Sequence, residues 1–207
     1  MKQNTKYGQA AYLTDEQLDL LINHLPEGPH KVAVCVMRWS ASRISETLML
    51  RWSDITENKI TYIKPNTKNN ETKKIDLHPR LKEVLTDWKQ VWYKYPLKAR
   101  KIASQSEVIK SEIKLPQPND WVFKGRIKGR HLNRKSVDRV LRRTLEQLGI
   151  EDASCHSMRR SMLTKLKDIG FLETDIMEVS GHKSLNSLKK YLKTSDAKKK
   201  EMIMSLN

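Results

Sequence analysis

The last third of the chain carries four side chains whose types and order match what cutting a phosphodiester bond requires. His156 and Arg159 are three positions apart, and Tyr191 follows His182 by nine positions. Cutting this bond without a metal needs a nucleophile, cations that hold the non-bridging oxygens, and an acid that protonates the leaving oxygen. Since a tyrosine hydroxyl ionises only near pH ~10, a tyrosine nucleophile needs cations and a histidine beside it.

The spacing of three residues between His156 and Arg159 would allow both side chains to act on one phosphate. On one helix it places both side chains on the same face, where they can reach the same phosphate. A guanidinium binds two phosphate oxygens at once and stays charged. Taken singly, each residue has a structural explanation, because Tyr191 is one of six tyrosines and histidines are often buried for packing. Their joint occurrence in this order favours a catalytic site.

The composition favours a nucleic acid as the partner. Lys and Arg number 40 against 24 Asp and Glu, which leaves a formal net charge of +16 over 207 residues. Such an excess is typical of proteins that bind polyanions. The alternative is a basic protein without this role, and composition alone does not separate the two.

The sequence gives little support to metal, disulfide or membrane chemistry. Cys35 and Cys155 are too few and too far apart for a zinc knuckle or a disulfide framework. A metal site built from His156 and His182 would lack other ligands at a suitable spacing, apart from Cys155. No stretch approaches the ~18 apolar residues of a membrane span, and the N-terminus has no apolar segment of a secretion signal. We therefore predict no metal site and a cytoplasmic protein.

The apolar residues recur mostly with the period of a helix, which predicts one mostly α-helical domain of the α+β class. Thr14 and Gln17 form the pattern of a capping box in front of the first helix. Ser42 is placed to cap the third helix, with Arg43 at its start. Helices are expected over residues 13–25, 32–39, 44–50, 81–92, 133–148, 155–169, 173–180 and 185–192.

One segment changes to a period of two. From Lys59 the apolar residues alternate, and after the polar turn 66–71 a second extended run reaches Leu77, which predicts a small antiparallel hairpin. A brief extended piece is expected at 121–123. Residues 97–118 are polar, rich in lysine and aperiodic, so we expect a surface insertion there.

Several segments resemble the catalytic domain of tyrosine recombinases, the phage integrase family. Residues 40–54, Ser-Ala-Ser-Arg-Ile-Ser-Glu-Thr-Leu-Met-Leu-Arg-Trp-Ser-Asp, are similar to the first arginine motif of the family, a Thr-Gly-Leu-Arg turn followed by a helix that ends in Leu-Arg-Trp-Ser-Asp. Residues 156–159 resemble its His-x-x-Arg box, and 180–184 its Leu-Gly-His-Ser segment. Thr67-Lys68 resembles the turn that delivers a catalytic lysine, and Tyr191 stands at the usual spacing from the Gly-His pair.

The resemblance implies a role for each matching residue. Tyr191 would attack the scissile phosphate and form a 3′-phosphotyrosyl link, while Lys68 protonates the released 5′-hydroxyl. Arg43 and Arg159 would hold the phosphate. His156 would assist proton transfer, and His182 would hydrogen-bond the phosphate or the attacking oxygen. The bond energy is kept in the phosphotyrosine, so no cofactor is expected.

The sequence departs from the family pattern in three respects. Ser40-Ala41-Ser42 stands in place of Thr-Gly-Leu, and Ser157 stands where the family often has aspartate. The catalytic region also begins almost at once, without the separate N-terminal core-binding domain of most members, as in the short fimbrial phase-variation invertases. We expect residues 1–207 to form a single catalytic domain.

The resemblance also implies a partner and an assembly. The partner would be double-stranded DNA that carries inverted repeats, bound by a homo-oligomer, with four protomers as the expected number. Apart from the resemblance, the amphipathic character of the tail, residues 195–207, leads us to expect that it docks on a neighbouring subunit. DNA-binding residues are expected on the polar face of the helix over 133–148 and beside the catalytic residues: Arg139, Arg142, Arg143, Arg160 and Lys183.

Three alternatives remain open from the sequence. A type IB topoisomerase uses similar residues but relaxes DNA as a monomer. A regulator or accessory factor would keep the fold and bind DNA without cutting it. An RNA-binding protein is less favoured, because such proteins stack bases on aromatic side chains and this chain has only two phenylalanines.

Overall fold

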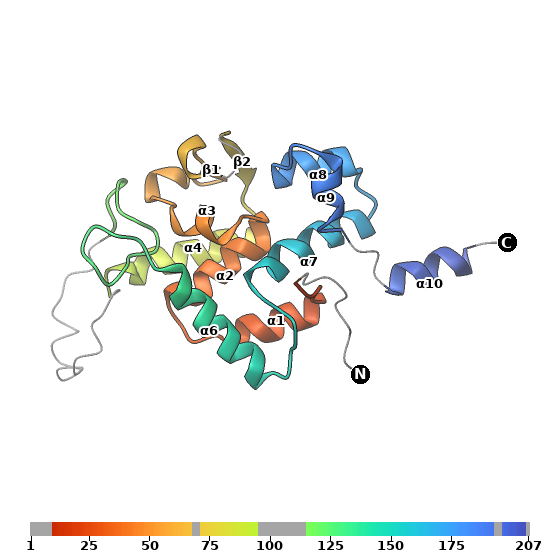
Figure 1. Cartoon of the computed structure of the whole chain (residues 1–207). Coiled ribbons are helices and arrows are strands. Elements are labelled where there is room, and N and C mark those ends of the chain that lie inside the picture. Colours follow the sequence, from red (N-terminus) through yellow and green to blue (C-terminus); the bar gives the residue numbers. More distant parts are fainter. Residues whose placement is uncertain (1–9, 68–70, 95–114, 193–195, 206–207) are drawn as a thin grey trace.

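The computed structural model describes residues 10–67, 71–94, 115–192 and 196–205. Within these residues helices dominate and one two-stranded antiparallel sheet is present (Figure 1). This is the predicted α+β class. The helices are α1 (Asp15–His24), α2 (Pro29–Ser40), α3 (Ile44–Leu48), α4 (Pro79–Val91), α6 (Arg134–Gln147), α7 (Cys155–Asp168), α8 (Glu173–Ser180), α9 (Leu185–Lys189) and α10 (Asp196–Met204), and the strands are β1 (Lys59–Tyr62) and β2 (Lys73–Asp76).

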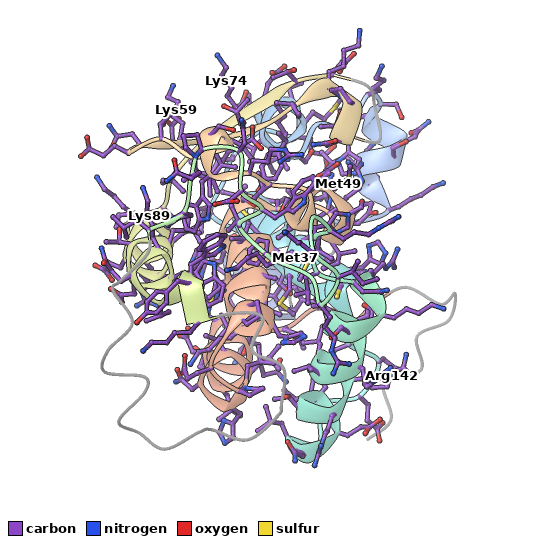
Figure 2. The ribbon with its side chains drawn as sticks, turned by 90° about the vertical axis from the view of Figure 1, so that its left-hand side faces the viewer. Met37, Met49, Lys59, Lys74, Lys89 and Arg142 are labelled. Carbon is purple, nitrogen blue, oxygen red and sulfur yellow. The ribbon has the colours of Figure 1, made fainter. Side chains whose placement is uncertain are left out.

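Helix α2 forms the centre of the fold. Its apolar run from Val32 to Met37 is continuous rather than periodic, and every residue in it is buried. A helix that is apolar all round must be surrounded by other elements. Helices α3, α4, α6 and α7 pack against it, and Figure 2 shows Met37 in the middle of the molecule.

The helix ends mostly follow the predicted signals. Thr14 and Gln17 form the expected capping box of α1. Ser42 does not cap α3: Arg43 occupies the N-cap position, and the Ser42 hydroxyl lies 2.6 Å from the hydroxyl of Thr47. The last predicted helix is also shorter than expected, because α9 ends at Lys189.

The hairpin confirms the change of period. Strands β1 and β2 are antiparallel, and Tyr62 pairs with Lys73 in their register. Residues 68–70 of the turn fall outside the described residues, as do residues 97–114 of the insertion expected at 97–118. Trp88 of α4 and Trp92, the residue after its end, donate their indole N–H groups to the carbonyls of Val122 and Trp121, at 2.9 Å each. These bonds tie α4 to the extended piece at 121–123.

The buried side chains form two clusters. The first core holds apolar residues from α1 through the start of α7, including Met37, Leu141 and Met158. The second core consists of Ala41, Leu163, Ile176 and Leu188, with Tyr191 partly buried against it. Helix α7 contributes Met158 to the first core and Leu163 to the second, so Arg159 lies where the two cores meet.

Candidate active site

Arg159 connects three elements around the centre of the site. Its side chain is buried, with 1% of the residue exposed. Its Nη1 donates to the carbonyl of Ala41, between α2 and α3, and its Nη2 donates to the carbonyl of Ser180 at 2.8 Å. Burial and the charge of Arg43 lower the pKa of Arg159 to about 10, so it stays charged at neutral pH.

The turn that presents the Ala41 carbonyl works without the glycine of the family pattern. Ala41 adopts the left-handed conformation that usually favours glycine, with φ 48° and ψ 26°. The hydroxyl of Ser40 donates to the carbonyl of Val36 at 2.7 Å and lies 2.6 Å from the hydroxyl of Tyr62. These hydrogen bonds hold the turn in place, so the serine-alanine-serine departure preserves the backbone geometry.

Arg43 stands at the N-cap of α3 and pairs with Glu46 one turn later. Its Nη1 lies 2.7 Å from Oε1 of Glu46, and its backbone N–H donates to Oε2 at 2.9 Å. Although burial alone would raise the pKa of Glu46, both hydrogen bonds from Arg43 lower it below its usual value. Glu46 was not among the predicted site residues; its signal was the i,i+3 spacing from Arg43, which lets the two charges meet.

His182 is held beside Arg159 by the end of α8. Gly181, at φ 67°, ends the helix in the left-handed conformation and turns the chain so that His182 is buried. Nδ1 of His182 lies 2.7 Å from the Ser180 hydroxyl, which donates to the Met177 carbonyl at 3.2 Å. Nη2 of Arg159 lies close to both ring nitrogens of His182, 3.3 Å from Nε2 and 3.5 Å from Nδ1.

The charge state of His182 follows from the same neighbours. Burial, together with the positive charges of Arg159 and Arg43, lowers the pKa of His182 to about 3. The ring is therefore neutral at physiological pH. Its part in any chemistry is that of a hydrogen-bonding group rather than a cation.

Tyr191 lies against this pair, directly after α9. Its ring centroid is 5.0 Å from that of His182, and Cζ of Arg159 is 5.4 Å from the Tyr191 ring. The backbone of Tyr191 is fixed by a 2.7 Å hydrogen bond to the carbonyl of Leu188 and by the hydroxyl of Thr164, which donates to its carbonyl at 3.3 Å. The structure therefore brings three predicted residues together: Arg159, His182 and Tyr191.

His156 lies in the first turn of α7, three residues before Arg159, and is more exposed than Arg159. Burial of its ring lowers its pKa, and the charges of Arg134, Arg159 and Arg43 lower it further. Ser157, at the position of the family aspartate, accepts a hydrogen bond from the backbone N–H of Ser154 at 3.1 Å and so completes a capping box. This substitution therefore leaves the start of α7 capped.

A pocket of about 540 Å³ opens between the hairpin and the α8–α9 connection. Arg43 and Glu46 line it on one side, and Gly181 and His182 line it on another. Lys68 lies outside the described residues, so its role as the acid stays a prediction. Lys73 of β2 lines the pocket but was not predicted as a site residue. Its signal was the strand period, which puts Lys73 on the same half-buried face as Ile75.

The predicted DNA-binding residues are spread over several surfaces. Arg139, Arg142 and Arg143 are exposed on α6, and Figure 2 shows Arg142 far from Lys74 and the hairpin. Lys183 borders the pocket, where its Nζ lies 3.0 Å from Oε1 of Glu71. Arg160 donates to the carbonyl of Ala10 at 2.9 Å. The DNA contacts of these five residues stay predictions.

Two further features concern metals and membranes. Among the described residues, no three His, Cys, Asp or Glu side chains gather closely enough to hold a metal ion. None of the helices in the described ranges is long and apolar enough to cross a membrane.

Comparison with known proteins gives consistent matches. The model of the phage integrase family matches residues 11–198. An integrase/recombinase of Escherichia coli and one of Pseudomonas aeruginosa are each 25% identical to the chain, and each match covers 84% of the chain. The chain spans 57% of the length of these two relatives.

Solved structures share the fold. The XerA recombinase superposes with a TM-score of 0.70 at 16% identity, covering 94% of this chain and 64% of that one. The XerH recombinase, solved with a palindromic difH substrate after cleavage, gives 0.70 at 18% identity, with 94% and 52% covered. The catalytic domain of bacteriophage HP1 integrase gives 0.59 at 13% identity and covers 96% of both chains.

Proposed function

The chain belongs to the phage integrase family, and on that premise we propose that it cuts and rejoins DNA strands at specific sites, with Tyr191 as the nucleophile. The observation that carries this proposal is the position of the Tyr191 ring beside both His182 and Arg159, 5.0 Å from the His182 ring centroid and 5.4 Å from Cζ of Arg159. A tyrosine placed next to a permanent cation and a neutral histidine has the surroundings that attack on a phosphate needs.

Each group has a defined task in the proposed reaction. Tyr191 gives its hydroxyl proton to His156 as its oxygen forms a bond to phosphorus. The bond from phosphorus to the 5′ oxygen breaks, and Lys68 gives that oxygen a proton. Arg43 and Arg159 stabilise the negative charge that builds on the non-bridging oxygens. His156 assists proton transfer.

His182 would act as a neutral hydrogen-bonding group, consistent with its low pKa. Attack by the free 5′-hydroxyl of another strand on the phosphotyrosine reverses the chemistry and rejoins DNA. The proposed reaction requires no cofactor.

The proposed partner is double-stranded DNA with inverted repeats, bound by four protomers in the cytoplasm. The XerH and Tn1549 integrase structures were solved with DNA, which supports this choice of partner. We place the contact between protomers at α10, which lies apart from the other helices in Figure 1 and exposes Met202, Ile203 and Met204. Such a row of apolar side chains is expected to be covered in an assembly. The single-domain organisation and the surface insertion at 97–118 stay predictions.

The test uses nicked, labelled DNA that carries the repeats flanking the gene, incubated with the protein in EDTA. A covalent complex that survives SDS is expected with the wild-type protein. Tyr191→Phe should abolish it. Tyr12→Phe, a change at a tyrosine outside the proposed catalytic site, should leave it intact.

Other outcomes point to the alternatives. A complex that persists in Tyr191→Phe contradicts the assignment of the nucleophile. DNA binding without any complex, at a verified site, favours a regulator that does not cut. Relaxation of a plasmid without recombination between two sites favours a topoisomerase.

A further inference from the structure

Lys73 has an unusual environment for a lysine. It is the cross-strand partner of Tyr62 in the hairpin, and its Nζ lies 4.9 Å from the centroid of the Tyr62 ring. The Nζ atom is fully buried and has no hydrogen-bond partner among the residues that the structure describes. Most lysines extend their ammonium groups into water, and the neighbouring Lys74 on the same strand is exposed.

The charged groups around the Lys73 amine are net positive, which favours the binding of an anion. The groups that act on its amine are Glu46, Arg159 and Arg43. Glu46 is already paired twice with Arg43, so this carboxylate is not available to Lys73 alone. Burial, opposed by Glu46 and reinforced by the two arginines, lowers the pKa of Lys73 to about 7. An anion that entered here would meet two guanidinium groups and this amine.

Packing alone does not explain a lysine at this position. The stem of Lys73 fills the space between Tyr62 and Gly181, where a Cβ added to the glycine would lie 3.4 Å from Cδ. An apolar side chain of the same length, such as methionine, would fill that space without burying an amine. A buried polar group without a partner lowers stability. Buried polar groups that lower the stability of the fold are typical of functional sites.

We propose that Lys73 is a phosphate-binding residue of the catalytic site and that its ammonium group contacts a non-bridging oxygen of the scissile phosphate beside Arg43 and Arg159. This role rests on the proposed function and adds to it a residue distinct from Lys68. Lys73 stabilises charge, whereas Lys68 delivers the proton to the leaving oxygen. The negative charge of the phosphate keeps the Lys73 amine protonated once DNA is bound.

The test compares Lys73→Met with Lys59→Met on two DNA substrates. The first has an ordinary scissile phosphate, and the second has a methylphosphonate there, which removes the negative charge. On the ordinary substrate Lys73→Met is expected to slow formation of the covalent complex on the order of 10²-fold, as for the loss of one transition-state contact. On the methylphosphonate its rate should come within about threefold of the wild-type rate, because the charge that Lys73 stabilises is absent. Lys59→Met, at an exposed lysine of β1 that lies outside the pocket lining, should match the wild type on both.

Melting temperature provides the second readout. Since the change removes a buried amine without a partner, Lys73→Met is expected to melt at a higher temperature than the wild type. A variant that melts lower or fails to fold shows that the amine is held by structural contacts and overturns the proposal. An equal loss of rate on both substrates, or no loss on either, overturns it as well.

A third substrate, with sulfur as the 5′ leaving atom, separates Lys73 from the acid. Sulfur leaves without needing a proton. This substrate should therefore restore the rate of covalent-complex formation in Lys68→Ala but leave the rate low in Lys73→Met. If sulfur restored the rate of Lys73→Met, Lys73 would be the acid, and the proposal that it contacts the phosphate would be overturned. Failure of the proposed function itself is recognised separately, because the wild-type protein would then form no covalent complex on ordinary DNA.

Discussion

The first core packs apolar side chains from α1 through the start of α7, whereas the second core has four buried members among the described residues: Ala41, Leu163, Ile176 and Leu188. Arg43 begins a helix that lies in the first core, and Tyr191 rests on the second. Segments with few buried apolar contacts open at lower free energy than the main core. Arg43, the arginine proposed to bind the phosphate, is therefore on the more stable part of the molecule, and Tyr191, the proposed nucleophile, is on the part that opens more readily.

The largest difference in stability should appear when one leucine is truncated in each core and the two variants are compared. Leu141→Ala, on α6, removes buried methyl groups from the first core and should lower the free energy of global unfolding by about 2–5 kcal/mol. Leu188→Ala, on α9, should change global unfolding much less, speed amide hydrogen exchange in α8 and α9, and slow covalent-complex formation. Denaturation followed by circular dichroism, with hydrogen exchange by mass spectrometry, checks both. Equal global effects would show that the two cores unfold as one unit.

Protonation of His182 should lower the stability of the folded protein in acid. The unfolded chain binds a proton on this histidine below pH ~6.5, whereas the folded protein keeps it neutral down to a pKa of about 3. The unfolded state binds more protons in this window, so stability falls as the pH is lowered from ~6.5 toward 3. His182→Gln should lose stability less steeply with acid in urea denaturation at stepped pH. His24→Gln, at an exposed histidine of α1, is the matched control, and parallel slopes for wild type and His182→Gln would contradict the prediction.

The smallest effect is expected at the turn that joins the two cores. Ala41→Gly relieves a left-handed backbone worth about 1 kcal/mol but removes a fully buried methyl worth about 0.8 kcal/mol. The free energy of unfolding should therefore change by less than about 0.5 kcal/mol, and the rate of cleavage should stay near that of the wild type. A loss above about 1 kcal/mol in urea denaturation would mean that the methyl group in the second core matters more than the backbone strain.

Local signals in the sequence were sufficient for most of the fold. The capping box of Thr14 and Gln17, the glycine at the end of α8 and the change to a period of two at Lys59 each depend on neighbouring residues alone. The same holds for the spacing of His156 and Arg159 on α7. Ser42 was a plausible cap by residue type, but its hydroxyl bonds to Thr47, so Arg43 begins the helix instead.

Long-range contacts account for what the sequence did not predict. The burial of the Lys73 amine requires Tyr62, Glu46 and Arg159 to converge from three elements, and no local pattern encodes that meeting. Tyr191 was expected inside a helix, yet a 2.7 Å bond from its backbone N–H to the Leu188 carbonyl places it just past the end of α9. Its position beside His182 therefore depends on how α7, α8 and α9 pack.

The tryptophans are unevenly placed, and this affects what fluorescence can detect. The five tryptophans of the chain are Trp39, Trp52, Trp88, Trp92 and Trp121, and all of them precede α7. Trp52, Trp88 and Trp92 are buried in the first core. Tryptophan fluorescence will therefore change when the first core unfolds but will not change when the segment that carries Tyr191 opens. A tryptophan introduced at Phe171, 53% exposed between α7 and α8, would give that opening an optical signal of its own.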